Sequence, residues 1–182
     1  EIRDLNIYNE LASIAVLQAL KIDIKNIKAK LKSFESPEGR GKKHSIIRYK
    51  KKFNLIDESY NANPLSVKNA INKLNLIKKE KFKKYLILGD MLELGSKSNK
   101  YHEQLSKVIN NSDIDKVFIK GKKTIFTYKQ LNKDKRGNIL QDNEDIDISL
   151  QELISNNHHI MIKGSNDTGL NNFSKKIWKG ED

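Results

Sequence analysis

The first forty residues show helical apolar spacing followed by a polar break. Apolar side chains recur every three or four positions over residues 7–20 and again over residues 23–31, and this spacing predicts two short helices. Residues 33–41 follow as a polar segment with one proline and two glycines. Such segments separate domains, so we expect a helical piece at residues 1–38 and a second domain at residues 39–182.

Short apolar runs and helical stripes alternate along the rest of the chain. Strands are predicted at residues 45–49, 53–56, 85–88, 117–119, 138–140 and 160–162. Helices are predicted in the intervals, around residues 64–74, 101–109, 122–131 and 150–154, with a last one at 170–177. This alternation predicts an α/β fold with a mostly parallel, Rossmann-like sheet flanked by helices.

Three of the predicted strands end in polar residues and glycines. These polar ends are residues 57–63, 89–95 and 163–167. Parallel α/β sheets bind ligands at the carboxyl ends of their strands. We therefore expect the three segments to contribute to one site.

The segment from Asp57 to Asn63 is the densest in chemistry. It holds two carboxylates, a hydroxyl, a phenol and two amides in seven positions. Carboxylates suit ribose hydroxyls, a magnesium ion or a substrate amine, whereas amides can bind a nucleobase edge or a peptide backbone. Asn63 also fits a plain helix cap, because Pro64 follows it.

The other two polar ends carry fewer candidates. Asp90 follows a glycine at a strand end, and Lys163 and Ser165 flank Gly164 in an arrangement suited to an anion. His102 lies in a predicted helix, where a hydrogen-bonding role is more frequent than catalysis. We expect no metal site formed by these side chains alone.

Composition narrows the classes of function. The chain of 182 residues has no cysteine, which excludes disulfides and thiol chemistry, and no apolar stretch long enough to span a membrane. It carries 35 Lys and Arg against 23 Asp and Glu, a net charge of +12. Because the lysines are scattered and arginines are few, we favour a solubilising surface over a nucleic-acid-binding one. No phosphate-binding loop of the G-x-x-x-x-G-K-[ST] type occurs.

These motifs together resemble the Mur ligases of peptidoglycan synthesis. Three matches lie in the second domain: Leu55–Pro64, Leu88–Gly95 with Ser98 and His102, and Lys163–Ser165. Two more precede them. Residues 6–12 resemble the end of the family's central ATPase domain, and Gly39-Arg40 resembles its interdomain arginine. The order and spacing fit from about residue 3 to residue 178. The chain departs from the family at Glu58, where an Asp is usual, and at Leu5, where a His is frequent.

The resemblance implies an ATP-dependent amide ligase. In such an enzyme ATP, with Mg²⁺, phosphorylates the carboxylate of UDP-N-acetylmuramoyl-tripeptide, and the amine of D-Ala-D-Ala attacks the acyl phosphate. The chain would then be the C-terminal part of a cytoplasmic enzyme, acting with N-terminal and central domains that are absent from this sequence. Because the phosphate-binding loop would lie in those domains and hold most of the ATP and Mg²⁺ contacts, we expect the isolated chain to be inactive.

The resemblance also implies roles for individual residues. Asn6 and Asn9 would face adenine, and Arg40 would face the phosphates. Asp57 or Glu58 would bind the ribose, with Tyr60 and Asn61 on the nucleotide side. The dipeptide side would include Asn63, Asp90, Lys163 and Ser165.

Three alternatives remain open on the sequence. The net charge allows a Lys-rich nucleic-acid-binding module, which would bind with a steep dependence on salt. A non-catalytic α/β interaction domain would leave the run from Asp57 to Asn63 unexplained. A related ligase acting on a different amino acid is the third.

Overall fold

A computed structural model describes residues 7–23, 25, 36–78 and 80–180. Its contacts divide the chain into two compact units, Glu1–Pro37 and Glu38–Asp182.

In the first unit, the predicted helix at residues 7–20 is confirmed as α1 (Ile7–Ala19). Several apolar side chains of this segment are exposed: Leu11 at 55% and Val16 at 58% in α1, and Leu20 just after it at 65%. The helix predicted over residues 23–31 lies almost entirely outside the described residues. The assignment of this unit to an ATPase domain stays a prediction.

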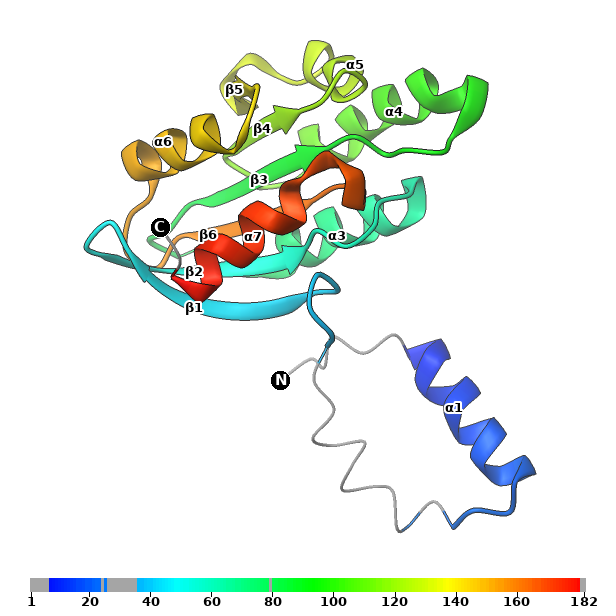
Figure 1. Cartoon of the computed structure of the whole chain (residues 1–182). Helices are drawn as coiled ribbons and strands as arrows, with labels where there is room; N and C mark the ends of the chain where they lie inside the picture. The colour runs from blue at the N-terminus through cyan, green and yellow to red at the C-terminus, as the bar shows by residue number, and fades with distance from the viewer. Residues whose placement is uncertain (1–6, 24, 26–35, 79, 181–182) are drawn as a thin grey trace. The chain divides into compact units, whose positions relative to one another are not determined.

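The second unit is built on a six-stranded sheet (Figure 1). Its strands are β1 (Lys42–Arg48), β2 (Lys51–Glu58), β3 (Lys84–Gly89), β4 (Lys116–Lys120), β5 (Arg136–Leu140) and β6 (His159–Lys163). The spatial order is β1-β2-β6-β3-β4-β5. Strand β1 runs antiparallel to β2, and every other neighbouring pair is parallel. The predicted mostly parallel α/β sheet is thus confirmed.

Helices cover both faces of the sheet. They are α3 (Pro64–Leu76), α4 (Ser98–Asn110), α5 (Thr124–Lys129), α6 (Asn143–Leu153) and α7 (Leu170–Lys179). Helices α3, α4 and α5 share one apolar core, and α6 and α7 share the other. Figure 1 shows α7 in front of the sheet and α3 behind it. No helix among the described residues is long and apolar enough to cross a membrane.

The central strand β3 is buried along its whole length and supplies both cores. Successive side chains of a strand point to opposite faces. Leu86 and Leu88 accordingly pack with α3 and α4, whereas Tyr85 and Ile87 pack with α6 and α7. A strand covered on both sides reads as a continuous apolar run, which explains why the sequence indicated it clearly.

The first two strands form a hairpin whose turn the sequence did not indicate. Arg48 pairs with Lys51, and the two residues between them, Tyr49 and Lys50, have positive φ angles of 54° and 57°. Asparagine and glycine favour such turns, and neither is present here. The Tyr49 hydroxyl donates a hydrogen bond of 2.6 Å to Asp147 of α6 and so holds this turn against the helix.

The strand order places the three polar strand ends side by side. β6 lies between β2 and β3 and runs parallel to both. The ends of β3 and β6 approach closely through Gly89 and Gly164. A Cβ on either glycine would lie 3.1–3.2 Å from the Cα of the other and at 3.0 Å or less from Leu170. Side chains at these positions would force the strand ends apart.

A buried lysine holds the opposite end of β3. Lys84 is fully buried, and its ammonium contacts Asp113 at 2.8 Å and donates a hydrogen bond of 3.0 Å to the Asn75 carbonyl. These contacts join β3 to the end of α3 and to the segment before β4.

We expect Lys84→Met to lower the free energy of unfolding by about 1–3 kcal/mol, because the volume is kept while the hydrogen bonds are lost. Urea denaturation monitored by circular dichroism measures this change. Lys83→Met, at the exposed neighbouring position, is the matched control and should change stability by less than about 0.5 kcal/mol. Equal effects of the two substitutions would contradict the role of the buried ammonium.

Candidate functional site

A cleft of about 220 Å³ lies where the three polar strand ends meet. It is lined by Tyr60 and Asn61 after β2, Leu92 and Glu93 after β3, and Ser165, Asn166 and Asp167 after β6. The expectation that these three segments converge is therefore met.

Asp57 is buried at the end of β2 and fastens the turn that precedes β1. It is 1% exposed. One carboxylate oxygen accepts a hydrogen bond of 3.1 Å from the Gly39 amide, and the other accepts from the Ser59 hydroxyl at 2.5 Å. Its backbone carbonyl accepts from the Gly41 amide at 2.7 Å. Both carboxylate oxygens thus serve the domain itself.

Arg40 lies on this turn, where its side chain is exposed to solvent and packs over the ring of Tyr60. Gly39 and Gly41 both have positive φ angles, +70° and +93°. A Cβ on Gly39 would lie 2.7 Å from the Cβ of Tyr60, so only glycine allows this approach. The Tyr60 amide donates a hydrogen bond of 3.1 Å to the Gly39 carbonyl, and the Arg40 guanidinium lies 4.3 Å from the Tyr60 ring centroid.

Lys163 of β6 holds the segment after β2 through hydrogen bonds to its backbone. It is 2% exposed, and its ammonium donates to the backbone carbonyls of Glu58 and Asn61. The Glu58 carboxylate lies 3.8 Å from it and 3.8 Å from Lys73 of α3. Burial lowers the pKa of Lys163, and the negative charge of Glu58 opposes this shift.

The segment after β3 is held by hydrogen bonds of three polar side chains. The Asp90 carboxylate accepts hydrogen bonds from the backbone amides of Lys123 and Thr124, at the start of α5. His102 of α4 accepts from the Met91 amide through Nε2 at 2.9 Å, and Ser165 accepts from the Leu92 amide at 3.0 Å. These contacts fix the backbone that leads into the cleft wall.

His102 is a buried hydrogen-bonding residue. It is fully buried, and its Nδ1 lies 2.8 Å from the Ser98 carbonyl, which can only accept. Nδ1 therefore carries the proton, and Nε2 is the acceptor for the Met91 amide. Burial lowers the pKa of His102, which keeps the ring neutral. A structural role was the favoured interpretation of the sequence, and this geometry supports it.

The predicted residues separate into two groups in space. Tyr60, Asn61 and Ser165 line the cleft, with Arg40 against Tyr60. Asp57, Glu58, Asp90 and Lys163 engage groups of the domain itself, as described above. Asn63 accepts a hydrogen bond of 2.8 Å from the Ser66 amide and caps α3. Asn6 lies outside the described residues, and Asn9 lies in α1 of the other unit.

Four residues of the cleft were missed as individual candidates: Leu92, Glu93, Asn166 and Asp167. All four lie within the polar strand ends that the sequence singled out. The sequence does not show which residues of these segments face the cleft. Their direction depends on local backbone geometry, such as the positive φ of 61° at Glu93. Asp167 is exposed in the cleft, whereas the Asp90 carboxylate binds the backbone amides of Lys123 and Thr124, and the sequence does not distinguish the two cases.

The described acidic and histidine residues form no cluster of metal ligands. No group of three or more histidine and acidic side chains lies close enough to hold a metal among them. Asp57, which binds the turn of Arg40, has both carboxylate oxygens in hydrogen bonds.

The sequence of the second unit matches a known family. Residues 44–166, more than half of the chain, match the family described as "Mur ligase, glutamate ligase domain". The chain therefore belongs to the Mur ligase family.

Individual relatives narrow the comparison. The UDP-N-acetylmuramoyl-tripeptide–D-alanyl-D-alanine ligase of Buchnera aphidicola is 38% identical over 113 residues, which are 62% of this chain and 24% of that protein. The enzyme of the same name from Bacillus subtilis is 30% identical over 141 residues, 75% of this chain and 30% of the relative. The chain thus spans less than a third of the length of these relatives.

Solved structures confirm the fold. The MurF ligase of Thermotoga maritima, determined in complex with ADP, superimposes with a TM-score of 0.75 at 22% identity, over 96% of this chain and 38% of that one. A MurF structure from Acinetobacter baumannii gives 0.76 at 21% identity, over 96% and 37%.

The buried His102 makes the cleft wall sensitive to acid. Its folded-state pKa is lowered, so its contribution to stability is complete above the unfolded pKa of about 6.5 and is lost as the pH falls below it. At pH values below about 6.5 we expect the free energy of unfolding to decrease. His102 should contribute at most about 1.4 kcal/mol to this decrease per pH unit. Urea denaturation between about pH 8 and pH 5 measures it.

His102→Gln keeps an acceptor for the Met91 amide without a titrating ring and should flatten this dependence. His44, His158 and His159 also have pKa values lowered by burial, so part of the acid sensitivity should remain. His44→Gln is the control: because it keeps His102, the Met91 amide signal in a nitrogen–proton correlation spectrum should change with pH as it does in the wild type. An unaltered pH profile in His102→Gln would refute the assignment.

Proposed function

We propose that the chain is the C-terminal part of an ATP-dependent ligase that joins D-Ala-D-Ala to UDP-N-acetylmuramoyl-tripeptide. The observation that carries the proposal is the cleft at the ends of β2, β3 and β6, since it is formed by the same three segments that carry the Mur ligase motifs. The names of the relatives point to this substrate pair. The resemblance to the family implies ATP-dependent chemistry in which the dipeptide amine attacks an acyl phosphate, and we propose that the enzyme works in the cytoplasm, where ATP is supplied.

Arg40 is the group of this unit suited to the nucleotide phosphates. It is exposed and lies on a turn that is hydrogen-bonded to β2. A guanidinium offers a planar fork of donors that matches phosphate oxygens. In the proposed reaction it would offset charge as the phosphoryl group moves to the tripeptide carboxylate.

Glu58 is the better of the two acids for the ribose. Asp57 is 1% exposed with both oxygens in hydrogen bonds, whereas the Glu58 side chain is 14% exposed and lies beside Gly41 of the same turn. The contacts of Asn6 and Asn9 with adenine remain proposals that rest on the resemblance.

The cleft suits the incoming dipeptide. Glu93 and Asp167 are exposed acids on its walls, and Asn61 and Asn166 add amide groups. Acids attract an ammonium group, and amides can pair with a peptide backbone. Held here, the dipeptide would present its amine to the acyl phosphate, the carbon–nitrogen bond would form, and phosphate would leave. Positioning of this kind supplies a large part of the rate acceleration in bimolecular reactions.

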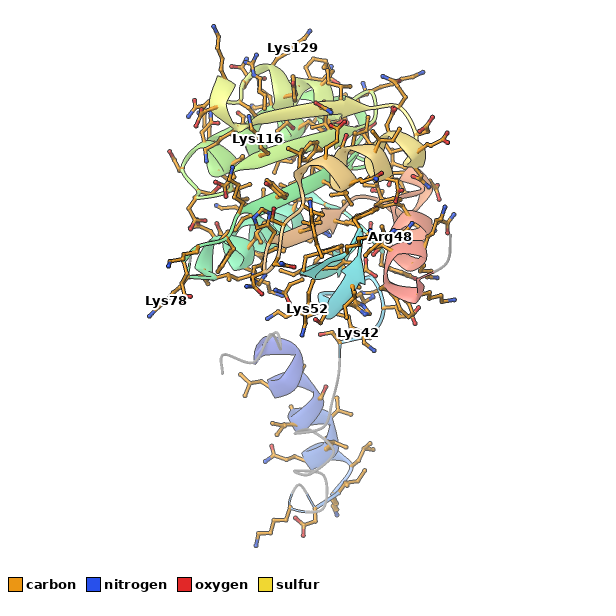
Figure 2. All side chains as sticks on the ribbon, turned by 90° about the vertical axis from the view of Figure 1, so that its left-hand side faces the viewer. Lys42, Arg48, Lys52, Lys78, Lys116 and Lys129 are labelled. Atoms are coloured by element: carbon orange, nitrogen blue, oxygen red, sulfur yellow. The ribbon has the colours of Figure 1, made fainter. Side chains whose placement is uncertain are left out.

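The distribution of positive charge does not favour nucleic acid as the partner. Figure 2 shows Lys42, Arg48, Lys52, Lys78, Lys116 and Lys129 spread over one side of the domain. They come from the three strands β1, β2 and β4, the helix α5 and the segment after α3. Nucleic-acid interfaces gather such charges along one stripe or groove.

In the full-length protein, we expect Arg40→Ala to lower kcat/KM for ATP by about 10- to 100-fold, the value of hydrogen bonds to a charged group. Phosphate release coupled to ligation measures this. Arg40→Lys keeps the charge without the fork and should recover part of the loss. An Arg40→Ala enzyme with an unchanged rate would remove the proposed phosphate contact.

The isolated chain of 182 residues serves as the blank for that experiment. It should neither hydrolyse ATP nor form amide bonds, because it has no phosphate-binding loop. Turnover by the pure chain would contradict the proposal that the phosphate-binding loop of another domain is needed for catalysis.

In the same full-length protein, we expect Asp167→Asn to raise KM for D-Ala-D-Ala about two- to fivefold, since one attraction for its ammonium group is lost at a partly solvated site. KM for ATP should be unchanged. The matched control is Asp134→Asn, which makes the same change of charge at an exposed position outside the cleft. If both variants raise the dipeptide KM equally, the effect comes from net charge and the proposed contact is refuted.

A further inference from the structure

Tyr60 belongs to two features of the site at once. The Arg40 guanidinium lies over its ring, 4.3 Å from the centroid, and the same residue lines the cleft. No other residue of the cleft lining contacts Arg40 in this way among the described residues. A change in the position of the Tyr60 side chain would therefore alter both its contact with Arg40 and the lining of the cleft.

The backbone around this contact is fixed. The Gly39 amide is bound to the Asp57 carboxylate, the Gly41 amide to the Asp57 carbonyl, and the Tyr60 amide to the Gly39 carbonyl. On the other side, Lys163 donates to the Glu58 and Asn61 carbonyls. The main chain on both sides of the contact is thereby held in place, and the Arg40 and Tyr60 side chains are the parts that can move.

The Tyr60 side chain itself has few constraints. It is 50% exposed, and its hydroxyl makes no hydrogen bond with the described residues. An exposed ring of this kind exchanges between rotamers, and contacts that favour one rotamer shift the population. A ligand in the cleft would provide such contacts.

The stacking leaves Arg40 able to bind an anion. A guanidinium that lies over an aromatic ring uses its flat face, whereas its N–H donors point outward in the plane. Arg40 can thus keep the ring contact and hold phosphate oxygens at the same time.

We propose that Tyr60 couples the two halves of the site: a dipeptide in the cleft holds the Tyr60 ring in the position that carries Arg40, and so strengthens nucleotide binding. This inference rests on the proposed function, because it assigns the dipeptide to the cleft and the phosphates to Arg40. By linkage, nucleotide must strengthen dipeptide binding by the same factor. The ring–cation contact at an exposed site sets that factor at about two- to fivefold.

The test uses the full-length protein and two probes, ADP and D-Ala-D-Ala. Isothermal titration gives the Kd of ADP without dipeptide and with saturating dipeptide, and the ratio is the coupling factor. We expect a factor of about two to five in the wild type and in Tyr60→Phe, which keeps the ring. We expect a factor of one in Tyr60→Leu, although both probes still bind. Thermal unfolding checks that the three proteins are equally folded.

The outcomes separate this inference from the proposed function. A coupling factor of one in the wild type, or an equal factor in Tyr60→Leu, would overturn the role of the ring while leaving the two binding sites in place. Failure of both probes to bind the wild type would overturn the proposed function and the inference together. Coupling lost in Tyr60→Phe as well as in Tyr60→Leu would show that the hydroxyl acts and the ring contact does not, which also overturns the inference.

A second readout addresses the arginine directly in the isolated chain. The signal of the Arg40 Nε–H group should shift when D-Ala-D-Ala is added to the wild type and to Tyr60→Phe, and should not shift in Tyr60→Leu. Signals of Arg136, whose guanidinium lies over Tyr128 outside the cleft, provide the internal control. A shift of the Arg40 signal in Tyr60→Leu would contradict transmission through the ring.

Discussion

The hydrogen bond between the Asp57 carboxylate and the Gly39 amide is the contact on which the arrangement of the site depends. It joins the end of β2 to the turn before β1, eighteen positions away in the sequence. A buried carboxylate is stable only when its oxygens are paired, and here the Gly39 amide and the Ser59 groups pair them. The same hydrogen bonds fix the position of the turn, and therefore the position of the Arg40 backbone relative to the sheet.

The two acids at the end of β2 consequently do different work. Asp57 points inward and binds backbone amides, whereas Glu58 lies between Lys73 and Lys163 beside the turn. Adjacent residues of a strand face opposite sides of the sheet, which makes this division a result of strand geometry. A shorter acid in the first position suits a tight turn over its own backbone, and a longer acid in the second can reach two ammonium groups.

The fold could be predicted from the sequence because its strands are short apolar runs between helical stripes. Strand β3, buried on both faces, gave the clearest signal, and the polar ends of β2, β3 and β6 indicated where the cleft would lie. The role of each polar residue could not be predicted in the same way. Asp90 and Asp167 both follow strands, but the first binds backbone amides at the start of α5 and the second lies exposed in the cleft. Sequence spacing places a residue at a sheet edge, whereas its partner depends on backbone angles and on loops from elsewhere in the chain.

Most polar groups of the three strand ends therefore stabilise the walls of the cleft and leave few for a ligand. Lys163 donates to carbonyls of the segment after β2, while His102 and Ser165 accept from amides of the segment after β3. Each of these groups is buried and joins two elements, so losing one would displace a wall of the cleft; Ser165 also lines the cleft itself. Residues that are both exposed and convergent, such as Tyr60, Asn61 and Asp167, are the ones that can bind a substrate directly. A motif residue in this site can thus support the recognition surface without being part of it, and its burial and hydrogen-bond partners indicate which role it has.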